Sequence, residues 1–277
     1  MARFAPFSAA LFVIFVSSAP SLYAADCSSQ LYLGKAPAIR NAALSAQTYS
    51  VCFSEISVLY SGVARTPLWS AEHLTSSRIE RAKTLPRLRS NAFHEETSLP
   101  SELRSELADY RRSGFDRGHM APNGDMSSPD SQEESFSLAN MIPQDPCNNE
   151  VLWEGIESAV RELTLQRGEV FVVTGPAFLG SEIQSLKGRV LVPTHLYKAV
   201  YVPAANASAA YFAPNDGSQS WEAISIAELE TRIGIDVFPQ LSAAVKVQPM
   251  TLPEPTPHFE CRLRTSEATA RSQTQGR

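Results

Sequence analysis

Residues 114–165 limit the fold of this chain more than any other part of the sequence. The stretch begins with the tetrad Asp116-Arg117-Gly118-His119, passes through Asn140 and Met141-Ile142-Pro143, and reaches Asn149. Because the residue before a proline avoids the helical region, the Met-Ile-Pro piece favours an extended strand. We therefore expect a strand or loop edge, a second strand and a helix, which together carry several polar side chains.

A long helix is predicted at the end of this stretch. It opens at Asn148 or Asn149, runs to about Gln166 and ends at Gly168, because Asn favours helix starts and Gly favours helix ends. Apolar residues spaced four, four and three apart predict its buried face: Leu152, Ile156, Val160 and Leu163. Residues spaced by four predict a second face, consisting of Asn149, Trp153, Glu157 and Arg161, in which Trp153 is interpreted as core packing.

The first 24 residues have the features of a secretory signal peptide. A positive Arg3 precedes a short apolar run at residues 9–16, and Leu22-Tyr23-Ala24 offers a cleavage site. The run is too short to span a bilayer, and an N-terminal anchor is the alternative interpretation. Cleavage leaves 253 residues. We expect a periplasmic or secreted protein with no membrane segment, one domain at residues 25–265 and a disordered tail at 266–277.

Four cysteines are spaced too widely for a zinc knuckle: Cys27, Cys52, Cys147 and Cys261. An even number in an exported chain indicates disulfide bonds, with buried free thiols as the alternative. We favour the pairs Cys27–Cys52 and Cys147–Cys261, each contributing about 3–5 kcal/mol through loop entropy. The second pair would fix the chain two residues before Asn149.

The formal charge is −5, and it becomes −6 when the signal peptide and its single Arg are removed. This acidity argues against non-specific electrostatic binding of nucleic acid by the protein as a whole, but it does not exclude a local basic cleft. Two groups of basic residues could form one: Arg81, Lys83, Arg87 and Arg89, and Arg104, Arg111, Arg112 and Arg117. Both groups also fit an ordinary solvated surface.

Outside residues 114–165 the pattern mixes strands and helices. Strands are expected at residues 56–60, 67–69, 170–173 (closed by Gly175-Pro176) and 190–202. Shorter helices are expected at residues 101–112 and 129–138 and between Ser225 and Gly234. The fold class is therefore α+β, with a central, mainly antiparallel sheet flanked by helices.

His119 is the strongest candidate for a general base. Unperturbed histidine titrates near ~6.5 and can take a proton from water at neutral pH. His119 follows an Asp and an Arg directly, and the adjacent Gly118 is interpreted as freeing the backbone to approach a ligand. The other histidines, His73, His94, His195 and His258, are interpreted as structural or surface residues.

Asn149 is the candidate ligand of a hard metal ion, because Mg²⁺ prefers oxygen donors and keeps several waters. An ordinary helix-capping Asn is the alternative. Glu157 lies on the same predicted helix face, where it could hydrogen-bond the waters of the metal or orient His119. A surface helix acid is the alternative for Glu157.

Asn140 and three arginines complete the candidate site. Asn140 could hold a loop or orient the base, or simply stabilise a turn. Arg65, Arg117 and Arg161 are candidate phosphate contacts, since a guanidinium matches phosphate oxygens bidentately. Asp116 is interpreted as support for the loop and not as a metal ligand.

These residues resemble those of the DNA/RNA non-specific endonuclease family, which belongs to the ββα-metal (His-Me finger) nucleases. The resemblance rests on the tetrad, Ala121-Pro122, Asn140, Pro143-Gln144 and the series Asn149, Trp153, Glu157. It is sharpest over residues 113–161 and extends more loosely from Tyr60 to Pro239.

The resemblance implies an Mg²⁺-dependent endonuclease, in which Mn²⁺ can replace Mg²⁺, acting on DNA and RNA with little sequence preference. His119 would be the general base, Asn149 the only direct protein ligand of the metal, and Glu157 the holder of its water shell. Arg65, Arg117 and Arg161 would contact phosphate, Asn140 would support the site, and the products would carry 5′-phosphate ends.

Three other functions remain open on the sequence. The first is a metal-dependent phosphodiesterase for small or non-nucleic substrates, which the acidic charge favours. The second is a nucleic-acid binder without catalysis, against which the intact His119 and Asn149 speak. The third is a disulfide-held interaction domain, which would show no metal dependence.

Overall fold

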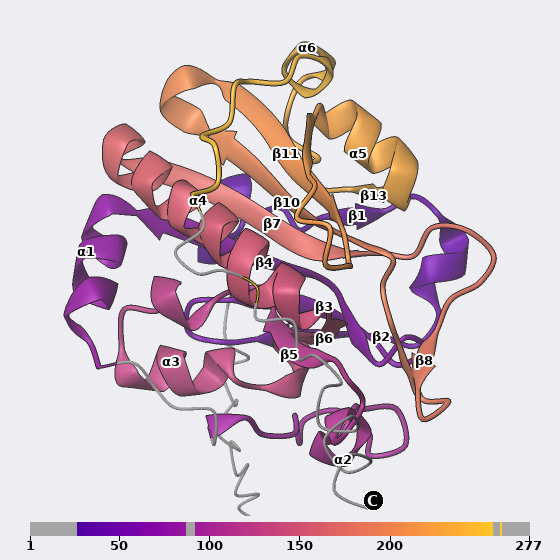
Figure 1. The fold of residues 1–277 in the computed structure, drawn as a ribbon. Helices are drawn as coiled ribbons and strands as arrows, with labels where there is room; N and C mark the ends of the chain where they lie inside the picture. Colours follow the sequence, from indigo (N-terminus) through magenta and orange to yellow (C-terminus); the bar gives the residue numbers. More distant parts are fainter. Residues whose placement is uncertain (1–26, 87–91, 257–260, 262–277) are drawn as a thin grey trace, which may run out of the picture.

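A seven-stranded antiparallel sheet runs through the middle of the protein (Figure 1). The computed structural model describes residues 27–86, 92–256 and 261, so the predicted signal peptide, the predicted tail, Arg87 and Arg89 lie outside the described residues. In spatial order the strands are β12 (Glu222–Ile224), β11 (Ala207–Pro214), β10 (His195–Val202), β7 (Glu169–Ala177), β4 (Thr66–Thr75), β3 (Ser57–Ser61) and β2 (Thr48–Cys52). The predicted α+β class is confirmed.

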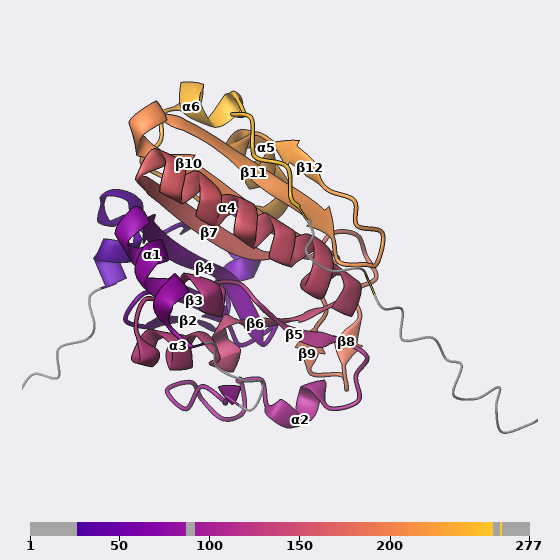
Figure 2. The ribbon, with the colours of Figure 1, turned by 60° about the vertical axis from the view of Figure 1, so that its left-hand side comes forward.

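The two faces of the sheet are covered by different helices. On β7, Val170 and Val172 pack in one cluster with Ile156 and Val160 of α4 (Glu154–Arg167). The alternate residues Phe171 and Val173 pack in a second cluster, with α5 (Ile226–Ile233) on the opposite face. Because successive strand residues point to opposite faces, the run at residues 170–173 must be apolar throughout. Figure 2 shows α4 lying along β7 and β10.

The remaining elements are short. The helices are α1 (Ser76–Thr84), α2 (Leu107–Tyr110), α3 (Pro129–Ser135) and α6 (Ala243–Val247). The small strand pairs are β1 (Ala38–Ile39) with β13 (Ile235–Asp236), β5 (Asp116–His119) with β6 (Met141–Gln144), and β8 (Ser185–Leu186) with β9 (Val190–Leu191). No helix among the described residues is long and apolar enough to cross a bilayer.

The sequence suggested that Gly175-Pro176 closes the strand, but in the structure both residues lie inside β7. A Cβ on Gly175 would approach the Leu68 carbonyl oxygen and the Tyr197 hydroxyl to 2.5 Å, so close packing selects the glycine. Pro176 pairs with Leu196 of β10, and it lies beyond Thr174, the last β7 residue paired with β4. The missing proline N–H therefore interrupts no ladder to β4.

Two predicted helices are shorter than expected. Only four residues of the 101–112 segment are helical, as α2, and the 129–138 segment ends its helix at Ser135. Ser128 caps α3, and Ser225 caps α5, whose end is Gly234 in a left-handed conformation. Both expected disulfides, Cys27–Cys52 and Cys147–Cys261, are present in the structure.

Candidate active site

The strands β5 and β6 form the two-stranded part of the predicted strand–strand–helix unit. They are antiparallel, with His119 opposite Met141 and Gly118 opposite Ile142. A Cβ added to Gly118 would lie 2.7 Å from the Cβ of Gln144 and closer still to its Oε1. The close packing of Gln144 therefore requires a glycine at position 118.

The helix start next to this hairpin is built by Asp145 and not by an asparagine. Pro146 and Cys147 are already helical, and the Asp145 carboxylate accepts the Cys147 N–H at 2.8 Å and the Asn148 N–H at 3.0 Å. Asp145 followed by proline is a common helix start. Asn149 is therefore not a capping residue, which removes the structural alternative for its side chain.

The first turns of the helix are π-helical over Asn148–Trp153 before α4 begins. Gln144 donates to the Asn148 side chain at 2.7 Å, and Asn148 donates to the Pro214 carbonyl at 2.9 Å. This chain of bonds joins β6, the π turn and β11. Single π turns are frequent at functional sites, and here the turn carries Asn149.

His119 is packed between aromatic rings. Its ring centroid lies 4.9 Å from that of Phe136 and 5.6 Å from that of Phe93. Burial lowers the pKa of His119 to about 4, and the nearby Arg117 guanidinium adds to the shift. Its Nε2 is buried and receives no hydrogen bond from the described residues. The imidazole is therefore neutral at pH 7 and can accept a proton.

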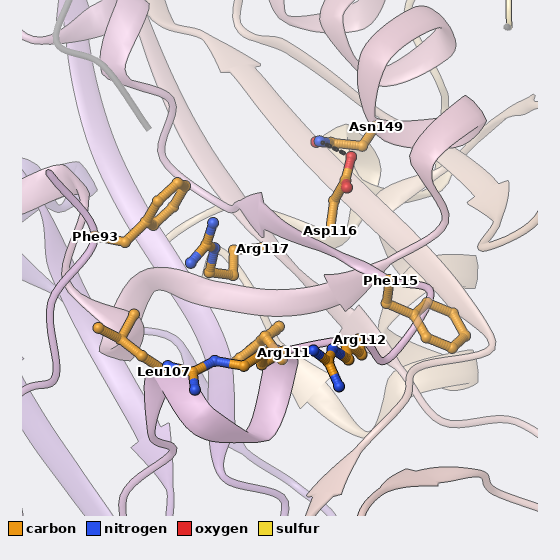
Figure 3. A pocket seen from close by; sticks show the side chains of 9 residues that line it. Phe93, Leu107, Arg111, Arg112, Phe115, Asp116, Arg117 and Asn149 are labelled. Atoms are coloured by element: carbon orange, nitrogen blue, oxygen red, sulfur yellow. Dashed lines mark hydrogen bonds between the residues drawn. The ribbon is translucent and has the colours of Figure 1, made fainter. Parts of the chain in front are cut away.

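Asn149 and Asp116 are in direct contact at a pocket. The Asn149 amide nitrogen donates to Asp116 Oδ2 at 3.1 Å, which joins the helix to β5 (Figure 3). Both residues line a pocket of about 570 Å³ together with Arg117. Asp116 thus holds the Asn149 side chain, and the Asn149 amide oxygen has no donor among the described residues.

Arg117 lies over the ring of Phe93, with its guanidinium carbon 4.1 Å from the ring centroid. This stacking holds the guanidinium at the pocket wall, and no carboxylate among the described residues pairs with its charge. Arg65 comes from the β3–β4 turn, where it has a φ of +56° and donates to the Arg104 carbonyl at 3.1 Å. Arg65 is not among the residues that line the pocket.

Glu157 and Arg161 lie further along α4, within a buried charged group. Burial raises the pKa of Glu157 to about 7; Asp125 and Glu154 add to the rise, whereas Lys198 and Arg161 oppose it. Arg161 donates to Asp125 Oδ1 at 3.0 Å and lies 3.8 Å from Glu154 Oε1. No hydrogen bond links Glu157 to His119 Nε2, so the structure gives no support for Glu157 as the group that orients the base.

Asn140 is fully buried beneath the loop that follows His119. Its side chain accepts from the Ser70 hydroxyl at 2.8 Å and the Ala121 N–H at 3.0 Å, and donates to the carbonyls of Ala121 at 2.8 Å and Ser135 at 3.0 Å. All four hydrogen-bonding positions of the amide are used. Asn140 therefore positions the loop and leaves no atom for the substrate.

Several residues that line the pocket were not singled out by sequence reasoning: Phe93, Leu107, Tyr110 and Phe115. Apolar and aromatic residues carry no motif outside their tertiary setting, so only the fold reveals them. Arg111 and Arg112 also line the pocket. Their place in a basic group was the available signal, and both line the pocket while remaining exposed to solvent.

Comparison with known proteins decides the family. The family model for the DNA/RNA non-specific endonucleases matches residues 35–244. The protein belongs to the DNA/RNA non-specific endonuclease family. The predicted family is confirmed, and with it the enzyme class of a hydrolytic endonuclease.

Relatives of this endonuclease come from distant organisms. Nuclease C1 of Cunninghamella echinulata var. echinulata is 35% identical over 206 residues, which cover 68% of this chain and 81% of that protein. A nuclease of Nostoc sp. is 30% identical over a match that covers 79% of this chain and 84% of that nuclease. The mitochondrial nuclease EXOG of Homo sapiens is 32% identical, covering 70% of this chain but only 58% of EXOG.

A solved structure agrees with the fold. A chain in the crystal structure of the EndoG/EndoGI complex matches this endonuclease with a TM-score of 0.62 and 28% identity, covering 72% of this chain and 89% of that chain. The agreement extends the sequence relationship to the overall fold.

Endonucleases of this family depend on a divalent metal ion, and the residues of the pocket fit one. The Asn149 amide oxygen is a hard donor, and it stands beside the Asp116 carboxylate. Among the described residues no group of three His, Cys, Asp or Glu side chains could hold a metal ion. An ion held mainly by one amide would keep several waters, as Mg²⁺ prefers.

Proposed function

We propose that this endonuclease is exported to the periplasm or the medium and hydrolyses the phosphodiester bonds of DNA and RNA with little sequence preference, using Mg²⁺ or, in its place, Mn²⁺. The observation that carries the proposal is the meeting of Asn149, Asp116 and Arg117 at one pocket of about 570 Å³, in which the lining residue Phe93 packs against the neutral His119. These groups suit a phosphate, a hard cation and a water that must lose a proton.

In this proposal His119 takes the proton from the attacking water. The bound phosphate brings negative charge, which raises the pKa of His119 toward the range in which a general base is most effective. Asn149 would hold the metal, with Asp116 orienting the Asn149 amide, and Glu157 would orient the waters of the metal. A bound metal would supply charge stabilisation at the departing 3′ oxygen. Cleavage of the P–O3′ bond gives a 5′-phosphate and a 3′ oxygen that takes up a proton from water to become a hydroxyl.

Arg117 has the best position for contact with the scissile phosphate, because it lines the pocket. Arg161 and Arg65 are also proposed phosphate contacts, although Arg161 is paired with Asp125 and would have to exchange that partner. Low sequence preference follows because phosphate contacts position a nucleic acid without reading its bases.

The proposal is tested by incubating the protein, with disulfides intact, with supercoiled plasmid and with RNA. Cutting of both in Mg²⁺, its loss in EDTA and the absence of discrete bands are expected. If polynucleotide kinase labels the product ends only after phosphatase treatment, the products carry a 5′-phosphate. A folded sample that cuts neither nucleic acid in any divalent metal would overturn the proposal.

A further inference from the structure

Arg111 and Arg112 belong to the half of the described arginines that have no acidic partner. Six other arginines form ion pairs with carboxylates: Arg40, Arg78, Arg104, Arg161, Arg189 and Arg232. Arg111 and Arg112 are exposed, and neither forms an ion pair with any residue in the described part of the chain. In a protein with a net charge of −5, two adjacent unpaired arginines make a local positive surface.

This positive surface adjoins the site. Arg111 and Arg112 line the same pocket as Arg117, Asp116 and Asn149, and Figure 3 shows the three arginines around it. They follow α2 and precede β5, the strand that carries Asp116 and His119. A substrate phosphate bound at Arg117 would therefore have its neighbours within reach of Arg111 and Arg112.

The backbone that carries these arginines is held in place by the two buried residues that precede them. Tyr110 is buried, and the buried Asp109 binds Arg189 at 2.9 Å and the Glu106 N–H at 2.9 Å. The turn that follows is defined by a φ of +57° at Arg112 and +86° at Gly114. A fixed backbone that carries free cationic side chains lowers the ordering cost of binding an anion.

We propose that Arg111 and Arg112 form a second phosphate site, which holds a backbone phosphate of the polynucleotide next to the one that is cleaved. This inference rests on the proposed function and adds a preference for substrates longer than a dinucleotide. Guanidinium groups bind phosphate oxygens through charge-assisted, often bidentate hydrogen bonds. Because these contacts carry no sequence information, they raise affinity without adding specificity.

The test compares wild type with the double variant Arg111→Gln/Arg112→Gln. Each arginine that neutralises a phosphate contributes about one unit to the slope of log affinity against log salt. The variant should lose about one to two units of that slope. Its KM for a ten-nucleotide strand should rise at least about fivefold, with a smaller change in kcat.

Substrate length separates this site from a general effect. In wild type, KM should be lower for the ten-nucleotide strand than for a dinucleotide, and the double variant should lose most of that difference. The matched control is Arg81→Gln/Lys83→Gln, which removes two exposed charges from α1, far from α2 in both views (Figures 1 and 2). The control should keep the wild-type salt slope and KM.

A binding measurement keeps the two proposals apart. Fluorescence anisotropy of a labelled oligonucleotide in EDTA reports affinity without cleavage. If wild type cuts nucleic acid but the double variant keeps its salt slope and length preference, the second phosphate site is overturned and the proposed function stands. If wild type cuts nothing but binds the oligonucleotide through these arginines, the second site stands and the proposed function falls.

Discussion

At the scale of single residues, the sequence motif predicts the role of His119, and the structure shows how its surroundings affect its protonation. The tetrad indicates a base, and the pKa of about 4, caused first by burial among aromatic rings, shows that the folded protein keeps this imidazole neutral. Asn140 shows the opposite case, since its four hydrogen bonds make it a support for the loop and not a reactive group.

His119→Ala should lower kcat for plasmid cutting by at least about 100-fold, because a positioned general base contributes roughly 10²–10⁴-fold. The fold should persist, which circular dichroism would verify. His94→Ala is a matched control, since His94 is only part-buried and its Nδ1 bonds to the Ala92 carbonyl. A His119 variant with the wild-type rate would remove His119 from the mechanism.

At the scale of secondary-structure elements, the site depends on how β5, β6 and the π turn are locked together. Gln144 lies against Gly118 on one side and binds Asn148 on the other, so one side chain connects the strand of His119 to the helix of Asn149. Asp145 and Pro146 then fix where that helix begins. The spacing of the candidate base and metal ligand is therefore set by the hairpin and the helix start.

Gly118→Ala should disrupt this connection, because the new Cβ would lie 2.7 Å from the Gln144 Cβ. We expect a loss of about 1–3 kcal/mol in the free energy of unfolding, as for other overpacked positions, together with a large fall in activity. Urea denaturation and plasmid cutting measure the two effects.

Gly217→Ala is the control for that variant. A Cβ there would meet the Cys147 Cβ at 3.8 Å, an ordinary contact, so stability and activity should stay near wild type. Equal losses in both variants would show that the Gly118–Gln144 contact has no special role.

At the scale of the whole molecule, the sheet brings charges from distant segments together beneath the site. Lys198 of β10 is buried, donating to the Thr174 hydroxyl of β7 at 2.8 Å and to the Met120 carbonyl at 3.3 Å. It also opposes the rise in the pKa of Glu157. The stability of the domain should therefore depend on pH through Glu157.

Folding raises the pKa of Glu157 from 4.5 to about 7, so the folded state holds this proton more tightly than the unfolded state does. The stability that the proton gives is full below pH 4.5 and is lost as the pH rises to 7. In EDTA, Glu157→Gln should therefore gain up to about 3 kcal/mol over wild type at pH 8 and nothing at pH 4. Urea melts across this range measure the difference, and a difference independent of pH would contradict the assignment.

The disulfide Cys147–Cys261 joins residues 114 positions apart and ends two residues before Asn149. Cys147→Ser/Cys261→Ser should lower the free energy of unfolding by about 3–5 kcal/mol and raise the Mg²⁺ concentration needed for half-maximal activity. Cys27→Ser/Cys52→Ser should lower stability while leaving the Mg²⁺ requirement unchanged. If both variants need the same Mg²⁺ as wild type, the disulfide does not anchor the metal helix.

The sequence by itself determined the family and the strand–strand–helix order and led to the prediction of His119 and Asn149 as site residues, because these depend on local residue types at fixed spacing. The end of the helix at Gly168 and the extended Met141-Ile142-Pro143 follow from the same local rules, whereas the helix starts at Pro146 and not at the predicted Asn148 or Asn149. Only the tertiary structure decided that Gln144 packs against Gly118 and that the Asn140 amide makes all four of its hydrogen bonds. It also decided that Arg111 and Arg112 adjoin the site, while Arg161 is paired with Asp125. Each of these facts depends on contacts between segments far apart in the chain, which no local pattern records.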